Sequence, residues 1–247
     1  MPVQAAAEQA PATLRADPRL IVPLDLPTVA EAEAMVERLG DAVSFYKVGL
    51  ELLATEGMGF ARRLKAAGHQ IFLDWKLHDI GATVRKSTAA LAGSGCDLLT
   101  VHAEPQVMRA AVEGRGSGSS LKILGVTVLT SLTDADLVDL GYGFTARDLV
   151  ARRVRQALDC GVDGVVSSPH EAAVVREIAV AAGRPDFLIV TPGVRPAWAG
   201  KDDQARAATP ADALTAGASH LVCGRPITAA ADPHAAALKV VEEMVGV

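Results

Sequence analysis

Short runs of apolar, mostly β-branched residues alternate along the chain with amphipathic stretches, and this alternation repeats eight times. Strands that alternate with helices in this way predict a parallel sheet covered by helices. Eight strands favour closure into a barrel, because open doubly wound sheets usually stop at about five or six. The sequence therefore predicts an α/β fold, a (β/α)8 TIM barrel in a single domain. The predicted strands are Leu20–Leu24, Ser44–Val48, Gln70–Leu73, Leu98–Val101, Lys122–Thr127, Gly164–Val166, Phe187–Val190 and His220–Cys223.

Capping residues mark where the helices between these strands begin and end. Capping-box spacing, or a proline at the first helical position, indicates a helix start. The predicted starts are Thr28 with Glu31, Ser168 with Glu171 and Pro169 as the first helical residue, and Thr209 followed by Pro210. Gly40, Gly68 and Gly183 fall where helices are expected to end. We interpret these Ser and Thr residues as caps rather than as catalytic groups.

The chain length of 247 residues matches the roughly 250 that one complete α/β barrel needs. We expect residues 1–18 to form a flexible N-terminal tail and residues 19–247 to form the barrel domain. Met1 to Ala16 lack the charged start and apolar middle of a signal peptide. The three cysteines, Cys96, Cys160 and Cys223, lack ligand-like spacing and are interpreted as reduced core residues. Together these features predict a cytoplasmic protein.

The charge pattern limits the kinds of partner the chain is expected to bind. Its formal net charge of −5 is spread along the sequence without a basic block, which argues against nucleic acid or a membrane as a partner. No apolar stretch reaches the roughly 18 residues of a membrane span. An anionic small molecule must then be bound by cations placed locally in its site.

Polar residues that end barrel strands are the candidates for chemistry, because they project into the C-terminal mouth where barrel enzymes form their sites. The candidates are Asp25, Lys47, Asp74, Lys76, Asp79, His102, Thr130, Ser131, Arg195, Gly224 and Arg225. Residues two apart on an extended segment point the same way, so Asp74 and Lys76 share the mouth while Trp75 points outward into packing. Lys47 on the adjacent strand is placed to join them. A structural salt-bridge network is the alternative interpretation of such a row.

The segment from Asp74 to Thr83, DWKLHDIGAT, resembles the signature of the orotidine 5′-phosphate decarboxylase family. Further motifs similar to those of the family recur in order along the chain. They are LDLP with Asp25, YKVGLEL with Lys47, VTVLTS at the fifth strand, TPGVRP from Thr191 to Pro196, and GRPIT from Gly224 to Thr228. The resemblance extends from Leu20 to the C-terminal helix and implies decarboxylation of orotidine 5′-phosphate to uridine 5′-phosphate, the last step of de novo pyrimidine nucleotide synthesis.

The resemblance also implies a role for each residue of the charged row. Lys76 is the proton donor to the carbon that loses carbon dioxide, and Asp74 lies against the departing carboxylate. Lys47 and Asp79 complete an alternating charge array. Asp79 and Thr83 reach the active site of a partner subunit, which implies a homodimer with shared sites.

The remaining implied roles concern substrate binding. Asp25 and Lys47 bind the ribose hydroxyls, and Thr130 and Ser131 contact the pyrimidine, with Thr133 as an alternative for that contact. The phosphate is held by Arg195, Gln204, Gly224 and Arg225. Arg195 and Gln204 lie on the long irregular stretch from Pro192 to Ala208, a candidate lid. His78 and His102 are interpreted as supporting hydrogen-bond partners.

No pyridoxal or thiamine motif is evident, so we expect no cofactor and no metal. The protein itself must then stabilise the carbanion that forms at C6 of the pyrimidine when carbon dioxide leaves. A fixed ammonium where negative charge develops does so and can then deliver the proton. One alternative is a magnesium-dependent sugar-phosphate decarboxylase or synthase of the same superfamily, with Glu51 as the nearby acidic candidate ligand. The other is a non-catalytic barrel that binds a phosphate ligand.

Overall fold

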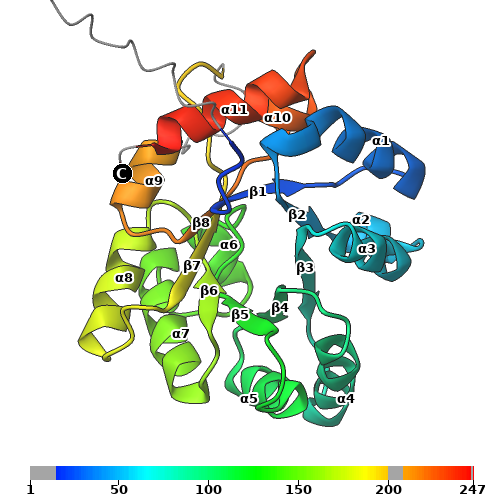
Figure 1. The fold of residues 1–247 in the computed structure, drawn as a ribbon. Helices are drawn as coiled ribbons and strands as arrows, with labels where there is room; N and C mark the ends of the chain where they lie inside the picture. The colour runs from blue at the N-terminus through cyan, green and yellow to red at the C-terminus, as the bar shows by residue number, and fades with distance from the viewer. Residues whose placement is uncertain (1–14, 200–207, 246) are drawn as a thin grey trace, which may run out of the picture.

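The computed structural model describes residues 15–199, 208–245 and 247. Its eight strands run parallel in sequence order, and the first pairs with the last to close a barrel that helices surround (Figure 1). The strands are β1 (Leu20–Pro23), β2 (Phe45–Val48), β3 (Gln70–Leu77), β4 (Leu98–His102), β5 (Lys122–Val126), β6 (Gly164–Val166), β7 (Leu188–Pro192) and β8 (His220–Val222). The predicted (β/α)8 barrel is confirmed.

Helices follow the strands and form the outer layer of the molecule. They are α1 (Val29–Leu39), α2 (Leu50–Leu53), α3 (Gly57–Ala66), α4 (Gly81–Ala92), α5 (Pro105–Arg115), α6 (Asp134–Asp139), α7 (Ala146–Cys160), α8 (Ala172–Ala181), α9 (Pro210–Thr215), α10 (Arg225–Thr228) and α11 (Pro233–Met244), with a 3-10 turn, η1 (Gly40–Ala42), after α1. In the described part of the chain no helix is long and apolar enough to cross a membrane.

The core has two parts because successive side chains of a strand point to opposite faces of the sheet. One set fills the barrel interior and includes Phe45, Phe72 and Leu124. The other set packs between the sheet and the helices and includes Tyr46 and Ile71. Strands buried on both faces explain the continuous apolar runs in the sequence.

Two of the three predicted helix starts are confirmed. The Thr28 hydroxyl accepts a hydrogen bond from Glu31 N at 3.2 Å, and the Thr209 hydroxyl caps α9, which Pro210 begins. The predicted ends are also found, since Gly40, Gly68 and Gly183 lie at or just after the ends of α1, α3 and α8 with positive φ.

The predicted start at Ser168 is wrong. The helix α8 begins at Ala172, and Glu171 occupies the N-cap position without a side-chain cap. The Ser168 hydroxyl instead accepts from His170 N at 3.2 Å, two residues along, which closes a local turn. Serine side chains form such turns as readily as helix caps, so the chain makes a turn here before the helix begins.

The N-terminal face of the barrel repeats one stabilising contact three times. In each case, the side chain of the residue just before an even-numbered strand accepts a hydrogen bond from a backbone N–H of the preceding odd-numbered strand. The pairs are Asp97 with Ile71 (2.7 Å), Asp163 with Ile123 (2.8 Å) and Ser219 with Ile189 (3.0 Å). Lys65, Arg115 and Arg176 respectively donate to the same three side chains. Each contact links two neighbouring strands to a cation on a helix, at the end of the barrel opposite the C-terminal mouth.

The three cysteines are free and buried, as predicted. Asp17, inside the expected tail, accepts hydrogen bonds from the backbone N and the guanidinium of Arg19. Residues 1–14 lie outside the described part of the chain, so the division into a tail, 1–18, and a barrel domain, 19–247, stays a prediction.

Candidate active site

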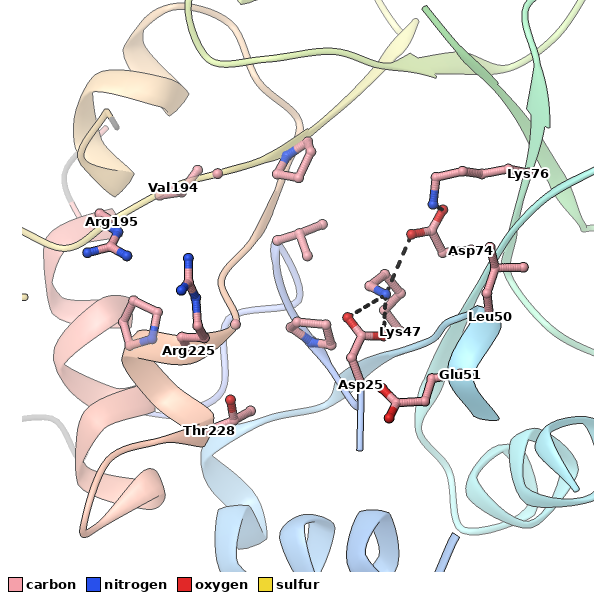
Figure 2. Close-up of a pocket in the computed structure, with 16 residues that line it drawn as sticks. Asp25, Lys47, Leu50, Glu51, Asp74, Lys76, Val194, Arg195, Arg225 and Thr228 are labelled. Atoms are coloured by element: carbon pink, nitrogen blue, oxygen red, sulfur yellow. Dashed lines mark hydrogen bonds and ion pairs between the residues drawn. The ribbon is translucent and has the colours of Figure 1, made fainter. Parts of the chain in front are cut away.

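A cavity of about 550 Å³ opens at the C-terminal ends of the strands. Its two sides carry different chemistry (Figure 2): a row of alternating acids and amines lies on one side, and two arginines lie across the space from it. The lining residues are Pro23, Asp25, Lys47, Leu50, Glu51, Asp74, Lys76, Pro192, Gly193, Val194, Arg195, Val222, Gly224, Arg225, Pro226 and Thr228. The cavity therefore suits a ligand with an anionic group remote from its reacting end.

The charged row follows the strand order β1, β2, β3. Lys47 Nζ lies 2.8 Å from Asp25 Oδ1 and 3.5 Å from Asp74 Oδ2, and Lys76 Nζ lies 2.9 Å from Asp74 Oδ1. Because the Lys47 side chain is only 9% exposed, its charge needs a compensating partner. The two carboxylates that flank it, those of Asp25 and Asp74, supply this compensation. Trp75 is buried in the cluster between sheet and helices, which confirms that it points away from the mouth. The predicted grouping of Asp25, Lys47, Asp74 and Lys76 is therefore observed.

The backbone at Lys76 is strained. Among the described residues it is the non-glycine residue with a positive φ, 48°, and it lies within a register shift between Leu73 and Leu77 where β3 pairs with β4. Such a conformation costs on the order of 1–3 kcal/mol and persists only where the surroundings enforce it. Lys76 N donates to Thr100 Oγ1 at 2.9 Å, one of the contacts that hold this conformation. Strain of this kind concentrates at functional sites.

The arginine side of the cavity comes from the ends of β7 and β8. Arg195 follows β7, and its backbone N donates to Ala208 O at 2.9 Å, beside a bridge between Val194 and Ala208. Arg225 follows β8 and begins α10, next to Gly224. The structure therefore brings Arg195, Gly224 and Arg225 together, as expected. Gln204 lies outside the described residues.

Asp79 and Thr83 do not line the cavity of their own chain. Asp79 follows β3, and its carboxylate accepts from Ile80 N at 2.6 Å. Thr83 is exposed in the first turn of α4, and the side chain of Ile80 between them is 71% exposed. In a single chain, Asp79, Ile80 and Thr83 therefore lie on the surface rather than in the cavity.

The segment between β5 and α6 leaves Thr130 and Ser131 exposed, and neither lines the cavity. Thr133 N-caps α6: its hydroxyl accepts from Asp136 N at 3.3 Å and donates to Asp136 Oδ2 at 2.7 Å. The cap gives Thr133 a structural role that the sequence analysis did not assign to it.

The two histidines near the mouth form a cluster beside the charged row. The rings of His78 and His102 lie 4.9 Å apart, and His78 Nε2 lies 3.7 Å from Glu104 Oε2. Burial lowers the pKa of His102, which favours the neutral form of its ring. Arg153, which lies against Tyr142, donates to Thr127 O at the start of the β5–α6 segment.

Comparisons with known proteins agree with this geometry. A model described as "Orotidine 5′-phosphate decarboxylase / HUMPS family" matches residues 18–240. The chain belongs to this family. A relative named orotidine 5′-phosphate decarboxylase from Caulobacter vibrioides (strain NA1000 / CB15N) is 79% identical over 95% of this chain and 100% of its own length. One of the same name from Caulobacter sp. (strain K31) is 76% identical over 94% of this chain and 100% of its own length.

Solved structures show the same likeness. A crystal structure of orotidine 5′-phosphate decarboxylase from Lactobacillus acidophilus superposes with a TM-score of 0.78 at 35% identity, covering 94% of this chain and 100% of that one. A crystal structure of orotidine 5′-phosphate decarboxylase from Pyrococcus horikoshii OT3 superposes with a TM-score of 0.72 at 26% identity, covering 92% of this chain and 100% of that one. The family resemblance predicted from the motifs is confirmed.

One residue of this family member's site was missed by the sequence analysis. Thr100 in the middle of β4 is fully buried, and its hydroxyl lies 3.0 Å from Asp74 Oδ1. Alternation along β4 places it on the same face as His102, two residues later. The sequence could therefore have placed Thr100 on the face of β4 that His102 shares. Which residue of β3 Thr100 contacts, however, depends on the register between the two strands.

Proposed function

We propose that this chain removes the C6 carboxylate of orotidine 5′-phosphate as carbon dioxide and releases uridine 5′-phosphate. The observation that carries the proposal is the Lys76–Asp74 pair, joined at 2.9 Å, on the far side of one cavity from Arg195 and Arg225. The substrate has the same layout, with a reactive carboxylate at one end and a phosphate at the other. The family membership and the relatives named orotidine 5′-phosphate decarboxylase support the same reaction.

The chemistry follows from the charged row. The bond between C6 and the carboxylate carbon breaks, its electron pair stays on C6, and carbon dioxide leaves. The Lys76 ammonium stabilises the developing negative charge more than it stabilises the bound substrate, and then donates its proton to C6. The neutral amine regains a proton from water. Asp74, which faces the departing carboxylate, disfavours the bound ground state.

The other lining residues bind the substrate away from the reacting carbon. Asp25 and Lys47 bind the ribose hydroxyls, which suits a carboxylate and an ammonium joined at 2.8 Å at the edge of the row. The phosphate is bound by the forked cations of Arg195 and Arg225 beside Gly224, together with Gln204. Thr130 and Ser131 contact the pyrimidine, which requires the β5–α6 segment to approach the cavity.

The proposed reaction uses no metal and no cofactor. Lys47 argues against a magnesium site that includes Asp74, because its ammonium lies 3.5 Å from Asp74 Oδ2 and would repel a divalent cation bound to that carboxylate. Within residues 15–199, 208–245 and 247, no three His, Cys, Asp or Glu side chains group as metal ligands. An absorbance assay of orotidine 5′-phosphate in excess EDTA tests this directly. Turnover that chelator abolishes would favour the magnesium-dependent alternative.

The Lys76→Ala variant distinguishes the proposed decarboxylase from a non-catalytic barrel that only binds a phosphate ligand. We expect the variant to lose turnover by about a thousandfold or more while uridine 5′-phosphate still binds, because the phosphate and ribose contacts remain. Binding is measured by isothermal titration of uridine 5′-phosphate. Unchanged turnover in the variant would refute the mechanism, and a wild-type chain that binds the nucleotide without turnover would identify the barrel as a binding protein.

We also propose a homodimer in which Asp79 and Thr83 complete the partner's site. Their outward position and the 71% exposed side chain of Ile80 support a second copy covering this surface. Mixing inactive Lys76→Ala and Asp79→Ala chains should restore about a quarter of wild-type activity, because random reassortment makes half the dimers mixed, each with one native site. Mixing Lys76→Ala with Asp74→Ala is the control, since both residues then belong to one chain's site. Activity that no mixture restores would refute the shared site.

We place the protein in the cytoplasm, which the free, buried cysteines support because they suit a reducing compartment. Fractionation of cells with an antibody against the chain tests this location. Recovery in a fraction other than the cytosol would refute it.

A further inference from the structure

We infer that Thr100 is a positioning residue for the Lys76–Asp74 pair, an inference that rests on the proposed decarboxylation. Thr100 lies in the middle of β4 and is fully buried. Its hydroxyl makes two hydrogen bonds with the site, to the side chain of Asp74 and to the backbone of Lys76. It is not among the residues that line the cavity, so it acts on the reaction through these two residues.

The first hydrogen bond sets the rotation of the Asp74 carboxylate. Thr100 Oγ1 donates to Asp74 Oδ1 at 3.0 Å, the same oxygen that receives the Lys76 ammonium at 2.9 Å. The hydroxyl has one proton, and the alternative acceptor, Leu73 O, is farther away at 3.5 Å and uncharged. With Oδ1 held in this way, Oδ2 faces Lys47 at 3.5 Å. Thr100 therefore keeps one carboxylate oxygen for each lysine.

The second hydrogen bond holds the strained backbone. Lys76 N donates to Thr100 Oγ1 at 2.9 Å, at the residue whose φ is 48°. A single atom, Thr100 Oγ1, thus holds both the backbone of Lys76 and the carboxylate of Asp74. Without the hydroxyl, the Lys76 N–H loses its acceptor, and relaxation of φ moves the whole Lys76 side chain away from its position beside Asp74.

Thr100→Val tests the inference because valine keeps the shape of threonine and removes only the hydroxyl. We expect kcat for orotidine 5′-phosphate to fall about 10- to 100-fold, the effect of losing one hydrogen bond to a charged group. KM and the affinity for uridine 5′-phosphate should change by less than about threefold, since the phosphate and ribose contacts are intact. Thr100→Ser should restore kcat to within about threefold of wild type, because it returns the hydroxyl without the methyl group.

Thr88→Val is the matched control. Thr88 is also fully buried, but its hydroxyl has no hydrogen-bond partner among the residues that the structure describes, and it lies on α4, away from the cavity lining. Its kcat should equal that of wild type. If Thr100→Val does not fold, Thr100→Ala replaces it, with the same expected loss of kcat and the same rescue by serine.

Three results would overturn the inference. The first is wild-type kcat in a folded Thr100→Val variant. The second is a Thr100→Ser variant that loses as much kcat as the valine variant, which would assign the effect to packing. The third is an equal loss of kcat in Thr88→Val. A wild-type chain without turnover would refute the proposed function itself, and the role of Thr100 with it.

Discussion

Replacing Asp163 with alanine tests whether the aspartates at the N-terminal face of the barrel serve stability alone. The Asp163 carboxylate accepts from Ile123 N at 2.8 Å and from the Arg115 guanidinium, and it lies 3.4 Å from Lys122 Nζ. Its side chain and that of Arg115 are each only 17% exposed. The substitution therefore leaves a backbone N–H and a largely buried guanidinium without their acceptor.

The expected loss of stability follows from these contacts. The unsatisfied Ile123 N–H costs about 1–3 kcal/mol. The orphaned Arg115 adds up to about 2 kcal/mol, less than for a fully buried ion pair because water reaches part of the guanidinium. The exposed Lys122 contributes about 0–1 kcal/mol. The middle values of these contributions sum to a fall in the free energy of unfolding of about 3–4 kcal/mol in Asp163→Ala, and we expect about half as much in Asp163→Asn, which keeps an acceptor for the backbone N–H.

Urea unfolding followed by far-ultraviolet circular dichroism measures this change. All variants are compared at one protein concentration, because association would make the apparent stability depend on concentration. Asp186→Ala is the control: Asp186 is 73% exposed and pairs with Arg184 at 3.2 Å, so its removal should leave the free energy of unfolding nearly unchanged. A loss in Asp163→Ala no larger than in the control would refute the reasoning, and so would a fall in kcat at a temperature where the variant is fully folded.

Two further predictions concern the site and the dependence of stability on pH. A Cβ at Gly49 would lie 2.4 Å from Asp25 Oδ1 and 2.8 Å from Lys47 Nζ, so Gly49→Ala should lower kcat/KM about 10-fold or more in steady-state assays; unchanged kinetics would contradict this. Burial lowers the pKa of His220 below 6.5, so the unfolded chain binds more protons and stability should fall as pH drops through 6.5. In urea titrations at several pH values, the free energy of unfolding should fall less steeply with decreasing pH in His220→Gln than in the wild type. An equal slope in the two proteins would contradict the prediction.

The fold was predictable because buried parallel strands and amphipathic helices leave different periodicities in the sequence. The bounds of β3 show where this information ends. The apolar run stops at Leu73, but the strand continues to Leu77, because the backbone resumes pairing with Val101 after a register shift. A polar residue pointing into the mouth interrupts the hydrophobic pattern without ending the strand. Ser168 shows the same limit, since a cap and a turn share one local signal.

The charged row was predictable for a different reason. Asp74 and Lys76 are two apart on one strand, so a local rule places them on one face. The contact of Thr100 with Asp74 depends on the pairing of Phe72 with Leu98, which sets Thr100 beside Asp74, and no local rule gives the register between two strands. The outward direction of Asp79 likewise depends on where β3 ends and α4 begins.

The two ends of the barrel use the same residue types for opposite purposes, and the contacts of each aspartate show the difference. Asp163 accepts from a backbone N–H and a guanidinium, so its carboxylate is fixed by the fold itself. Asp74 accepts from side chains, the ammonium of Lys76 and the hydroxyl of Thr100, and its carboxylate lines the cavity. A side chain that is held only by other side chains can exchange these partners for a ligand without breaking the barrel. Substitutions at Asp163 should therefore lower the free energy of unfolding without changing kcat of the folded chain, whereas substitutions at Asp74 should lower kcat.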